Sequence, residues 1–343
     1  MMIMHAAKGT AREDSWAIVL AGGWGLRLRG CTVDHSGRHV PKQFCLIDGE
    51  HTLLQLAIAR ASSLVGLERV VVVALTQHRR WWQPQLKGIL PPENVVAQPL
   101  GRGTAIGVLL PLLHVLAREP EAHVVFLPAD HYFRHEGRLA EELQRALEYT
   151  YDAPEDLVFV GIEPESPTSD FGYLVPQAAG ETDPKLIASF VEKPPPEFAE
   201  ILIRRGALWN SLIFAARGQC VLRLIQGCFP HTVDALREAM VQAGDPTSRA
   251  RALAAVYLNL ASIDFSKDVL ERGGCTLRVM PAAAVGWADL GTPDRLAAFW
   301  DEQHPAVTRG SAGIPVSAPS DRLASLHDLA PTVTDKVELS PPE

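Results

Sequence analysis

The chain has 343 residues, of which 47 % are apolar and 21 % charged. This composition is typical of a folded globular protein and excludes a fibrous or disordered one. Its 32 Lys and Arg residues against 40 Asp and Glu residues give a net charge of −8, so no overall positive field favours nucleic acid as a partner.

Three further features exclude common classes of protein. The 5 cysteines contain no CxxC pattern, so we expect reduced thiols in a cytoplasmic protein rather than a disulfide framework or a zinc site. Residues 1–15 hold no apolar stretch that resembles a signal peptide, so we expect no export. The longest apolar run, 105–117, is shorter than the roughly 20 residues that a membrane helix needs.

Short apolar runs rich in β-branched residues alternate with longer helical patterns through the first half of the chain. The runs predict strands because they lack the alternation of a half-exposed strand, which indicates a parallel sheet covered by helices on both faces. The predicted strands are 16–21, 70–75, 95–97, 124–127 and 157–160, and the predicted helices are 52–65, 104–118 and 136–149. Ligands of such sheets bind at the carboxyl ends of the strands.

The pattern changes near residue 165, where Pro and Gly clusters separate shorter apolar runs. We expect a second lobe packed on the first sheet, so that an N-terminal extension (1–14) precedes a domain (15–303) with two halves (15–164 and 165–303). The predicted elements of the second half are strands at 171–175, 187–191 and 212–215, helices within 220–258, a strand pair at 276–280 and 283–287, and a last helix at 293–300. Residues 304–343 are rich in Pro, Ser and Thr and predict a weakly structured tail.

A glycine-rich segment, AGGWGLRLRG, directly follows the first predicted strand. Its glycines, Gly22, Gly23 and Gly25, allow a tight turn whose bare N–H groups can surround phosphate oxygens, and Arg27 and Lys42 can neutralise the phosphate charge. A dinucleotide fingerprint would need Gly or Ala at Leu28, and the GKS or GKT of a P-loop is absent. A structural turn is the alternative for the glycines alone.

Two carboxylates are candidates for a metal site. Asp130 follows a buried strand in LPADH, where a carboxylate can hold Mg²⁺, although helix capping is the alternative. Asp289 stands beside Gly291 in WADLG, where a turn-forming role is the alternative. His131 and His135 have helical spacing but no third partner, so we expect no zinc there.

Polar residues in the second half suit a sugar phosphate, because hydroxyl groups need donors and acceptors in set directions and Lys can bind phosphate. The alternative for Glu192 and Lys193 is a solvated ion pair. The candidates are Gly172, Glu192, Lys193 and Asn210.

Seven motifs, in this order and spacing, resemble those of the sugar-1-phosphate nucleotidyltransferases, most closely the mannose-1-phosphate guanylyltransferase branch. The resemblance covers about residues 15–300 and implies an α/β fold with a Rossmann-like mixed, mostly parallel sheet flanked by helices and a smaller sugar-binding lobe. The motifs are VPKQF (40–44), QPLGRGTA (98–105), LPADH (127–131), FVEKP (190–194), WNS (209–211), SIDF (262–265) and WADLG (287–291).

The resemblance also implies a reaction: transfer of a nucleotidyl group from an NTP to a hexose-1-phosphate, with GTP and mannose-1-phosphate as the expected pair, giving an NDP-sugar and pyrophosphate. The implied catalytic residues are Arg27, Lys42 and Asp130, and the implied Mg²⁺ ligands are Asp130 and Asp289. The implied nucleotide-binding residues are Gly22, Gly23, Gly25, Gln98, Gly103 and Thr104. The implied sugar-phosphate-binding residues are Gly172, Glu192, Lys193, Asn210 and Asp264.

The chain departs from the family pattern in the glycine-rich loop. Leu26 stands where the family has Thr, and no Pro occurs between Leu26 and Pro41, so a hydroxyl that could bond a phosphate is absent. The alternative hypothesis is therefore a non-catalytic nucleotide-sugar sensor or partner subunit. A homo-oligomer is left open, and we expect none of the fused isomerase domain that some relatives carry.

Overall fold

The computed structural model describes residues 11–34, 36–46, 51–177, 183–241 and 245–303. Within them, one sheet holds nine strands in the order β3-β2-β1-β4-β9-β6-β10-β8-β7. Its strands are β1 (Ser15–Ala21), β2 (Val70–Leu75), β3 (Val95–Gln98), β4 (His123–Pro128), β6 (Asp156–Ile162), β7 (Gly172–Pro176), β8 (Lys185–Val191), β9 (Leu208–Arg217) and β10 (Thr276–Ala282).

The sheet is mixed, as expected. Parallel pairing joins β3, β2, β1 and β4 and also joins β6 to β10, whereas β9 runs antiparallel to both of its neighbours, β4 and β6. The predicted Rossmann-like arrangement of parallel strands with flanking helices is therefore confirmed for the first half. The strands of the second half extend the same sheet rather than building a separate one, because β9 inserts between two strands of the first half.

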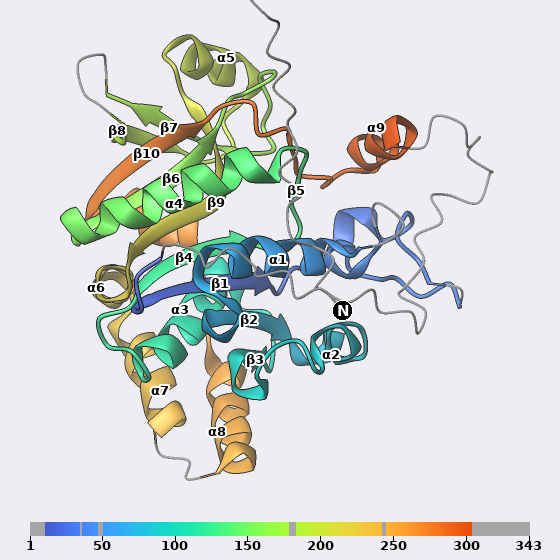
Figure 1. The fold of residues 1–343 in the computed structure, drawn as a ribbon, viewed down its shortest axis with the longest axis vertical. Helices are drawn as coiled ribbons and strands as arrows, with labels where there is room; N and C mark the ends of the chain where they lie inside the picture. Colours follow the sequence, from blue (N-terminus) through green and yellow to red (C-terminus); the bar gives the residue numbers. More distant parts are fainter. Residues whose placement is uncertain (1–10, 35, 47–50, 178–182, 242–244, 304–343) are drawn as a thin grey trace, which may run out of the picture.

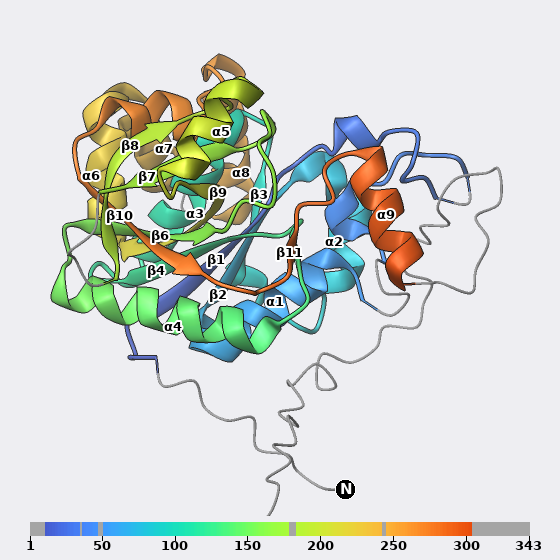
Figure 2. The ribbon, with the colours of Figure 1, turned by 90° about the horizontal axis from the view of Figure 1, so that it is seen from above.

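Helices cover both faces of this sheet (Figures 1 and 2). α1 and α4 pack on one face and α3 and α6 on the other, with α7 and α8 beyond α6. The helices are α1 (Leu53–Val65), α2 (Arg79–Leu86), α3 (Gly103–Leu116), α4 (Glu136–Asp152), α5 (Pro196–Arg204), α6 (Gly218–Cys228), α7 (Pro230–Val241), α8 (Pro246–Asn259) and α9 (Pro293–Gln303). Side chains of β1 alternate between the two resulting cores, so the strand is buried on both sides.

The prediction of a strand pair between residues 276 and 287 was wrong, and a second, two-stranded sheet forms instead. The strand pair expected at 276–280 and 283–287 does not form, because the chain leaves the extended conformation at Ala284, whose φ is 53°, and at Gly286, whose φ is 63°. β10 instead joins β6 in the large sheet, and β11 (Trp287–Ala288) pairs with β5 (Tyr132–Phe133).

Two helices were not expected from the sequence. α2 includes Pro84 and reads RRWWQPQL, with no regular apolar spacing, and α5 begins at the last of three consecutive prolines, Pro196. The tail predicted for 304–343 and most of the 1–14 extension lie outside the described residues. None of the described helices combines the length and apolar character that a membrane span requires, and all five cysteines, which are described, are free thiols.

α1 is held at its start by a capping box and in its middle by a buried ion pair. Thr52 accepts from the Gln55 backbone N–H while the Gln55 side chain accepts from the Thr52 N–H, which satisfies two donors at the helix end. Arg60 donates from Nε and Nη2 to Glu136 of α4 at 2.8 and 2.6 Å and lies over the Phe133 ring. This pair ties α1 to the start of α4.

We expect Glu136→Gln to lower the free energy of unfolding by about 2 kcal/mol, because it leaves the buried Arg60 guanidinium without its counter-charge. This loss is smaller than for a fully buried ion pair because the Glu136 side chain is partly exposed. The matched control is Glu200→Gln, which removes the exposed Arg204–Glu200 pair and should change the value by less than about 0.5 kcal/mol. Urea denaturation measures both; equal effects would contradict the assigned importance of the buried pair.

Candidate active site

Pairing of β5 with β11 brings together the two carboxylates that are more than 150 residues apart in sequence. Trp287 lies opposite Phe133 and Ala288 opposite Tyr132. Because the two strands are antiparallel, Asp289 follows β11 at the end where His131 and Asp130 precede β5. Asp130 also lies two residues after the end of β4, at the carboxyl edge of the large sheet, where ligands of such folds bind.

The Lys42 ammonium lies between these two carboxylates. Its Nζ is 3.3 Å from Asp130 Oδ2 and 3.1 Å from Asp289 Oδ1, and it also donates to the Asp289 carbonyl oxygen. Only 6 % of the Lys42 side chain is exposed. A buried cation with two anionic partners is well compensated, so the three groups form a compact cluster with one surplus negative charge.

His131 completes the buried part of this cluster. Its Nε2 lies 3.9 Å from Asp130 Oδ1 and 3.9 Å from Asp289 Oδ1. Burial lowers the pKa of His131, and this outweighs the opposing effect of the two carboxylates, so the ring is neutral near pH 7. Burial tends to raise the pKa of Asp289, but the charges of Lys42 and Arg27 and the hydrogen bond from Lys42 outweigh it and hold that pKa below its ordinary value; Asp289 is therefore ionised.

Two arginines surround the outer side of Asp289. Arg295, in the first turn of α9, donates from Nη1 to Asp289 Oδ2 at 3.4 Å and from Nη2 to Asp170 Oδ2 at 2.5 Å. Arg27 lies 3.8 Å from Asp170 Oδ1. A Cβ at Gly291 would collide with Asp289 Oδ2 and come within 3.0 Å of Arg27 Nη2, so Gly291 lets the backbone approach the charged groups closely.

The glycine-rich loop leaves β1 beside this cluster. Gly25 adopts a left-handed conformation with φ 60°, and Leu26–Leu28 form a 3-10 turn that has no side-chain cap. The Gln43 side chain stabilises the loop, because its Nε2 amide group donates hydrogen bonds to the carbonyl oxygens of Ala21 and Gly23 at 3.1 and 2.8 Å. Leu26 is 58 % exposed, so its side chain makes little contribution to the turn.

The predicted nucleotide-binding residues at the end of β3 contact neighbouring protein groups. Gln98 is buried and donates to the Tyr257 hydroxyl at 3.1 Å, and a Cβ at Gly22 would lie 3.2 Å from Gln98 Oε1. Gly103 has a φ of 82°, and a Cβ there would overlap the Ile263 carbonyl group. Gln98 thus lies against the first glycine of the loop, and Gly103 permits close approach of the segment that carries Asp264.

Thr104 and Asp264 join these two segments. The Thr104 hydroxyl accepts from the Phe265 N–H at 2.7 Å and donates to Asp264 Oδ2 at 3.4 Å. Asp264 also caps the π-helix Phe265–Val269 by accepting from the Lys267 N–H at 3.0 Å. These contacts give both side chains a structural role, in addition to the binding roles that the resemblance implies.

The structure brings three of the predicted sugar-phosphate residues together on β7, β8 and β9. Gly172 lies opposite Asn210 across the β7–β9 pair, and a Cβ at Gly172 would lie 2.6 Å from Glu192 Oε2. Asn210 donates to Ser266 Oγ at 3.3 Å, which links this group to the Asp264 segment. Lys193 is exposed and donates to Glu192 at 2.7 Å.

The predicted residues thus form two groups. Gln98, Thr104, Asp264 and Asn210 contact segments on the face of the sheet covered by α3 and α8. The charged cluster around Lys42 lies at the carboxyl edge of β1 and β4.

A cavity of about 410 Å³ lies beside Asp289, and its lining includes the rings of Tyr132, Phe171, Trp209, Trp287 and Phe299. Trp209 and Phe171 line it, whereas their chain neighbours Asn210 and Gly172 do not, because successive side chains of a strand point to opposite faces. Trp209 and Trp287 each hold a buried indole N–H without a partner among the described groups.

Two residues with direct contacts to this site were missed in the sequence. Gln43 lies inside VPKQF, yet only Lys42 was singled out from that motif. Arg295 stands six positions after Asp289, in GTPDR. The only sequence signal for Arg295 was a basic residue at the start of the last predicted helix, where the helix dipole favours acidic residues instead.

Comparison with known proteins gives the family. The chain matches the model of the nucleotidyl transferase family over residues 16–304. It is 31 % identical over 290 residues to a mannose-1-phosphate guanylyltransferase of Escherichia coli K12. The aligned region covers 82 % of this chain and 59 % of that protein. A mannose-1-phosphate guanylyltransferase of Salmonella typhimurium is also 31 % identical, over 81 % of this chain and 58 % of its own length.

The chain therefore spans about three fifths of the length of these curated relatives. A solved structure described as a mannose-1-phosphate geranyltransferase from Thermus thermophilus superposes with a TM-score of 0.66 at 28 % identity, over 81 % of this chain and 76 % of that one. The α/β fold and the resemblance inferred from the motifs are confirmed by these matches: the chain belongs to the nucleotidyl transferase family.

Proposed function

We propose that this protein transfers a nucleotidyl group from an NTP to a hexose-1-phosphate, releasing pyrophosphate and an NDP-sugar. The observation that carries the proposal is the Lys42 ammonium held between Asp130 and Asp289, at the sheet edge next to the glycine-rich loop. The named activity of the relatives in Escherichia coli and Salmonella supports GTP and mannose-1-phosphate as the substrates.

Asp130 and Asp289 fit the requirements of Mg²⁺, which takes one or two protein carboxylates and completes its shell with water and phosphate oxygens. Within the described residues, no group of three or more His, Cys, Asp or Glu side chains is arranged to hold a metal by itself, so substrate phosphates would supply the remaining ligands. When bound, Mg²⁺ would neutralise phosphate charge and orient the reacting groups. Lys42 must then leave the space between the carboxylates.

The chemical problem is the approach of two anions, since the sugar phosphate oxygen attacks the α-phosphorus of the nucleotide in line. The backbone N–H groups of the loop 22–25 bind phosphate oxygens. Arg27 is exposed and can turn from Asp170 toward the triphosphate, and Lys42, once displaced from the carboxylates, contributes a second cation. No covalent enzyme intermediate is required.

We assign the two substrates to the two halves of the domain. Residues 15–164 contribute the loop, Gln98, Gly103 and Thr104 for the nucleotide, and residues 165–303 contribute Gly172, Glu192, Lys193 and Asn210 for the sugar phosphate. Asn210 and Glu192 offer acceptors for hydroxyl groups, and the exposed Lys193 offers a cation for the phosphate. Asp264 supports the boundary between the halves.

The second candidate function is a nucleotide-sugar sensor or partner subunit without catalysis, and Leu26 is the observation that favours it. The 3-10 turn at Leu26–Leu28 forms without any side-chain cap, however, so the fold of the loop does not require the family's Thr.

Substitution Leu26→Thr distinguishes these two functions. Because Leu26 is exposed and the turn is already formed, we expect pyrophosphate release to stay within about threefold of the parent protein. A gain of tenfold or more, measured at saturating substrates, would mean that the parent loop is degraded and would support the sensor.

We expect Asp130→Asn to reduce pyrophosphate release by at least about a hundredfold, as for the loss of one electrostatic contact to the transition state. Asp234→Asn, an exposed change on α7, is the matched control and should leave the rate unchanged. Circular dichroism should show the same fold for both variants. Turnover at the parent rate in Asp130→Asn would remove the metal assignment.

The substrate pair is identified by pyrophosphate release with Mg²⁺, using GTP, ATP, UTP, CTP and dTTP against mannose-, glucose-, fucose- and galactose-1-phosphate. We expect release with GTP and mannose-1-phosphate. Removal of divalent metal by EDTA should stop it. No release with any pair, while a GDP-sugar still raises the melting temperature, would contradict catalysis and support the sensor.

A further inference from the structure

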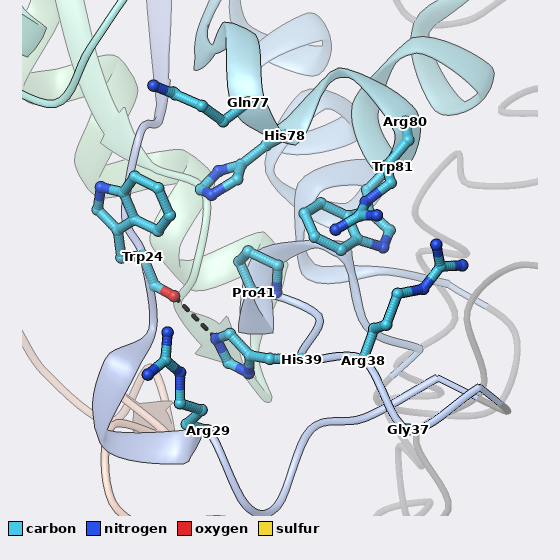
Figure 3. A pocket seen from close by; sticks show the side chains of 10 residues that line it. All are labelled: Trp24, Arg29, Gly37, Arg38, His39, Pro41, Gln77, His78, Arg80 and Trp81. Carbon is cyan, nitrogen blue, oxygen red and sulfur yellow. Dashed lines mark hydrogen bonds between the residues drawn. The ribbon is translucent and has the colours of Figure 1, made fainter.

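A second cavity, of about 500 Å³, lies between the glycine-rich loop and the start of α2 (Figure 3). One wall comes from the loop and the segment that follows it, and the other from Gln77 to Trp81. Lys42, Asp130, Asp289 and Arg27 are not among its lining residues. The residues that line it are Trp24, Arg29, Gly37, Arg38, His39, Pro41, Gln77, His78, Arg80 and Trp81.

The lining is cationic although the whole chain carries a net charge of −8. Three arginines, Arg29, Arg38 and Arg80, surround the cavity in Figure 3, and none of the described residues that line it is acidic. Arg38 is paired with Asp34 at 3.2 Å, and Arg80 lies over the Trp81 ring at 4.1 Å. Clustered guanidinium groups repel one another and bind phosphate oxygens with good geometry, so the cavity favours an anion with several charges.

His78 gives a second, independent indication of a ligand. The residue is only 2 % exposed, it lines the cavity, and its Nδ1 is buried without a hydrogen-bond partner among the described groups. Burial, with smaller effects from His39 and Arg80, lowers the pKa of His78 to about 4, so the ring is neutral near pH 7 and its one N–H can lie on Nδ1 and donate to a ligand oxygen. Buried polar atoms normally have a partner.

Aromatic rings provide an apolar wall beside the arginines. The ring of Trp24 is 4.8 Å from that of His78, and Trp81 is 5.6 Å from His78 on the other side. The Trp81 ring already stacks on Phe44, whereas Trp24 is 43 % exposed. A planar base can therefore pack on the indole of Trp24.

We propose that this cavity is an oligophosphate-binding site, separate from the Lys42 cluster, and that a nucleoside di- or triphosphate is its ligand. The phosphates bind Arg29, Arg38 and Arg80, and the base packs against Trp24. An inorganic oligophosphate shares the charged part of this chemistry and differs in having no base. The proposal rests on the cavity itself and does not depend on the reaction proposed above.

A ligand in this cavity would act on the glycine-rich loop. His39 hydrogen-bonds the Trp24 carbonyl oxygen through Nε2 at 3.0 Å (Figure 3), and a Cβ at Gly101 would lie 3.1 Å from Trp24 Nε1. Pro41 lines the cavity, and Lys42 follows it directly. Occupation of the cavity is thus coupled to the position of the loop and of Lys42.

The test is calorimetric titration of the full chain, without divalent metal, with tripolyphosphate and with GDP. We compare the parent with Arg29→Ala/Arg80→Ala, with Arg27→Ala and with the control Arg205→Ala/Arg251→Ala, which removes the same charge from exposed positions on other elements. Loss of charged hydrogen bonds to phosphate predicts at least tenfold weaker tripolyphosphate binding in Arg29→Ala/Arg80→Ala and near-parent binding in the control and in Arg27→Ala.

If tripolyphosphate binding is lost in Arg27→Ala but unchanged in Arg29→Ala/Arg80→Ala, the anion binds at the Lys42 cluster and the proposal is overturned. The proposal is also overturned if the parent protein binds no tripolyphosphate at millimolar concentration. Trp24→Leu then separates the two sources of phosphate. A nucleotide ligand predicts that GDP binds more tightly than tripolyphosphate and that Trp24→Leu weakens GDP alone. Equal affinities would identify an inorganic oligophosphate as the ligand and overturn the nucleotide assignment.

Discussion

The mutual repulsion of Asp130 and Asp289 is the constraint on which the rest of the site depends. Two carboxylates in a low-dielectric site cannot both stay ionised unless a cation lies between them, and Lys42 provides that cation here. Lys42 thus neutralises the two carboxylates in the structure. Under the function that we propose, a divalent metal would displace Lys42, which would then supply a cation to the phosphates.

Two glycines occur where neighbouring groups approach the backbone so closely that a Cβ would not fit. A side chain at Gly103 would overlap Ile263, and one at Gly291 would overlap Asp289. At Gly103, the missing Cβ lets two parts of the chain that are far apart in sequence meet, and at Gly291 it leaves room for the Asp289 carboxylate and the Arg27 guanidinium. Gly25 differs, because its left-handed φ shapes the glycine-rich loop itself.

The cationic cavity and the charged cluster both adjoin the segment that runs from the glycine-rich loop to Lys42, whereas the cavity beside Asp289 borders the charged cluster alone. The aromatic cavity beside Asp289 includes Arg295, and the cationic cavity near α2 includes Trp24. The segment from the loop to Lys42 therefore connects the cationic cavity with the charged cluster of Lys42, Asp130 and Asp289. Any movement of this segment changes the position of Lys42, which is the group with the largest electrostatic effect in the site.

Local pattern was sufficient for most of the elements and for most of the motif residues, but not for α2, α5, β5 and β11. Uninterrupted apolar runs gave β1, β2, β4 and β6, because strands buried on both faces need no alternation. Asp130 was located by its position after such a strand. Leu26 showed as a departure in the sequence, but only its exposure in the folded loop explains why the turn tolerates it.

Tertiary structure alone decided which residues meet. β5 and β11 are two-residue strands with no sequence signature, and their register places Asp289 beside Asp130 and His131. Arg295, Gln43 and the cavity near α2 likewise depend on contacts between segments far apart in the chain, which no local periodicity encodes. The sequence by itself determined the family, the order of strands and helices and the charged groups available; packing determined their distances, and those distances set the charge balance on which the chemistry depends.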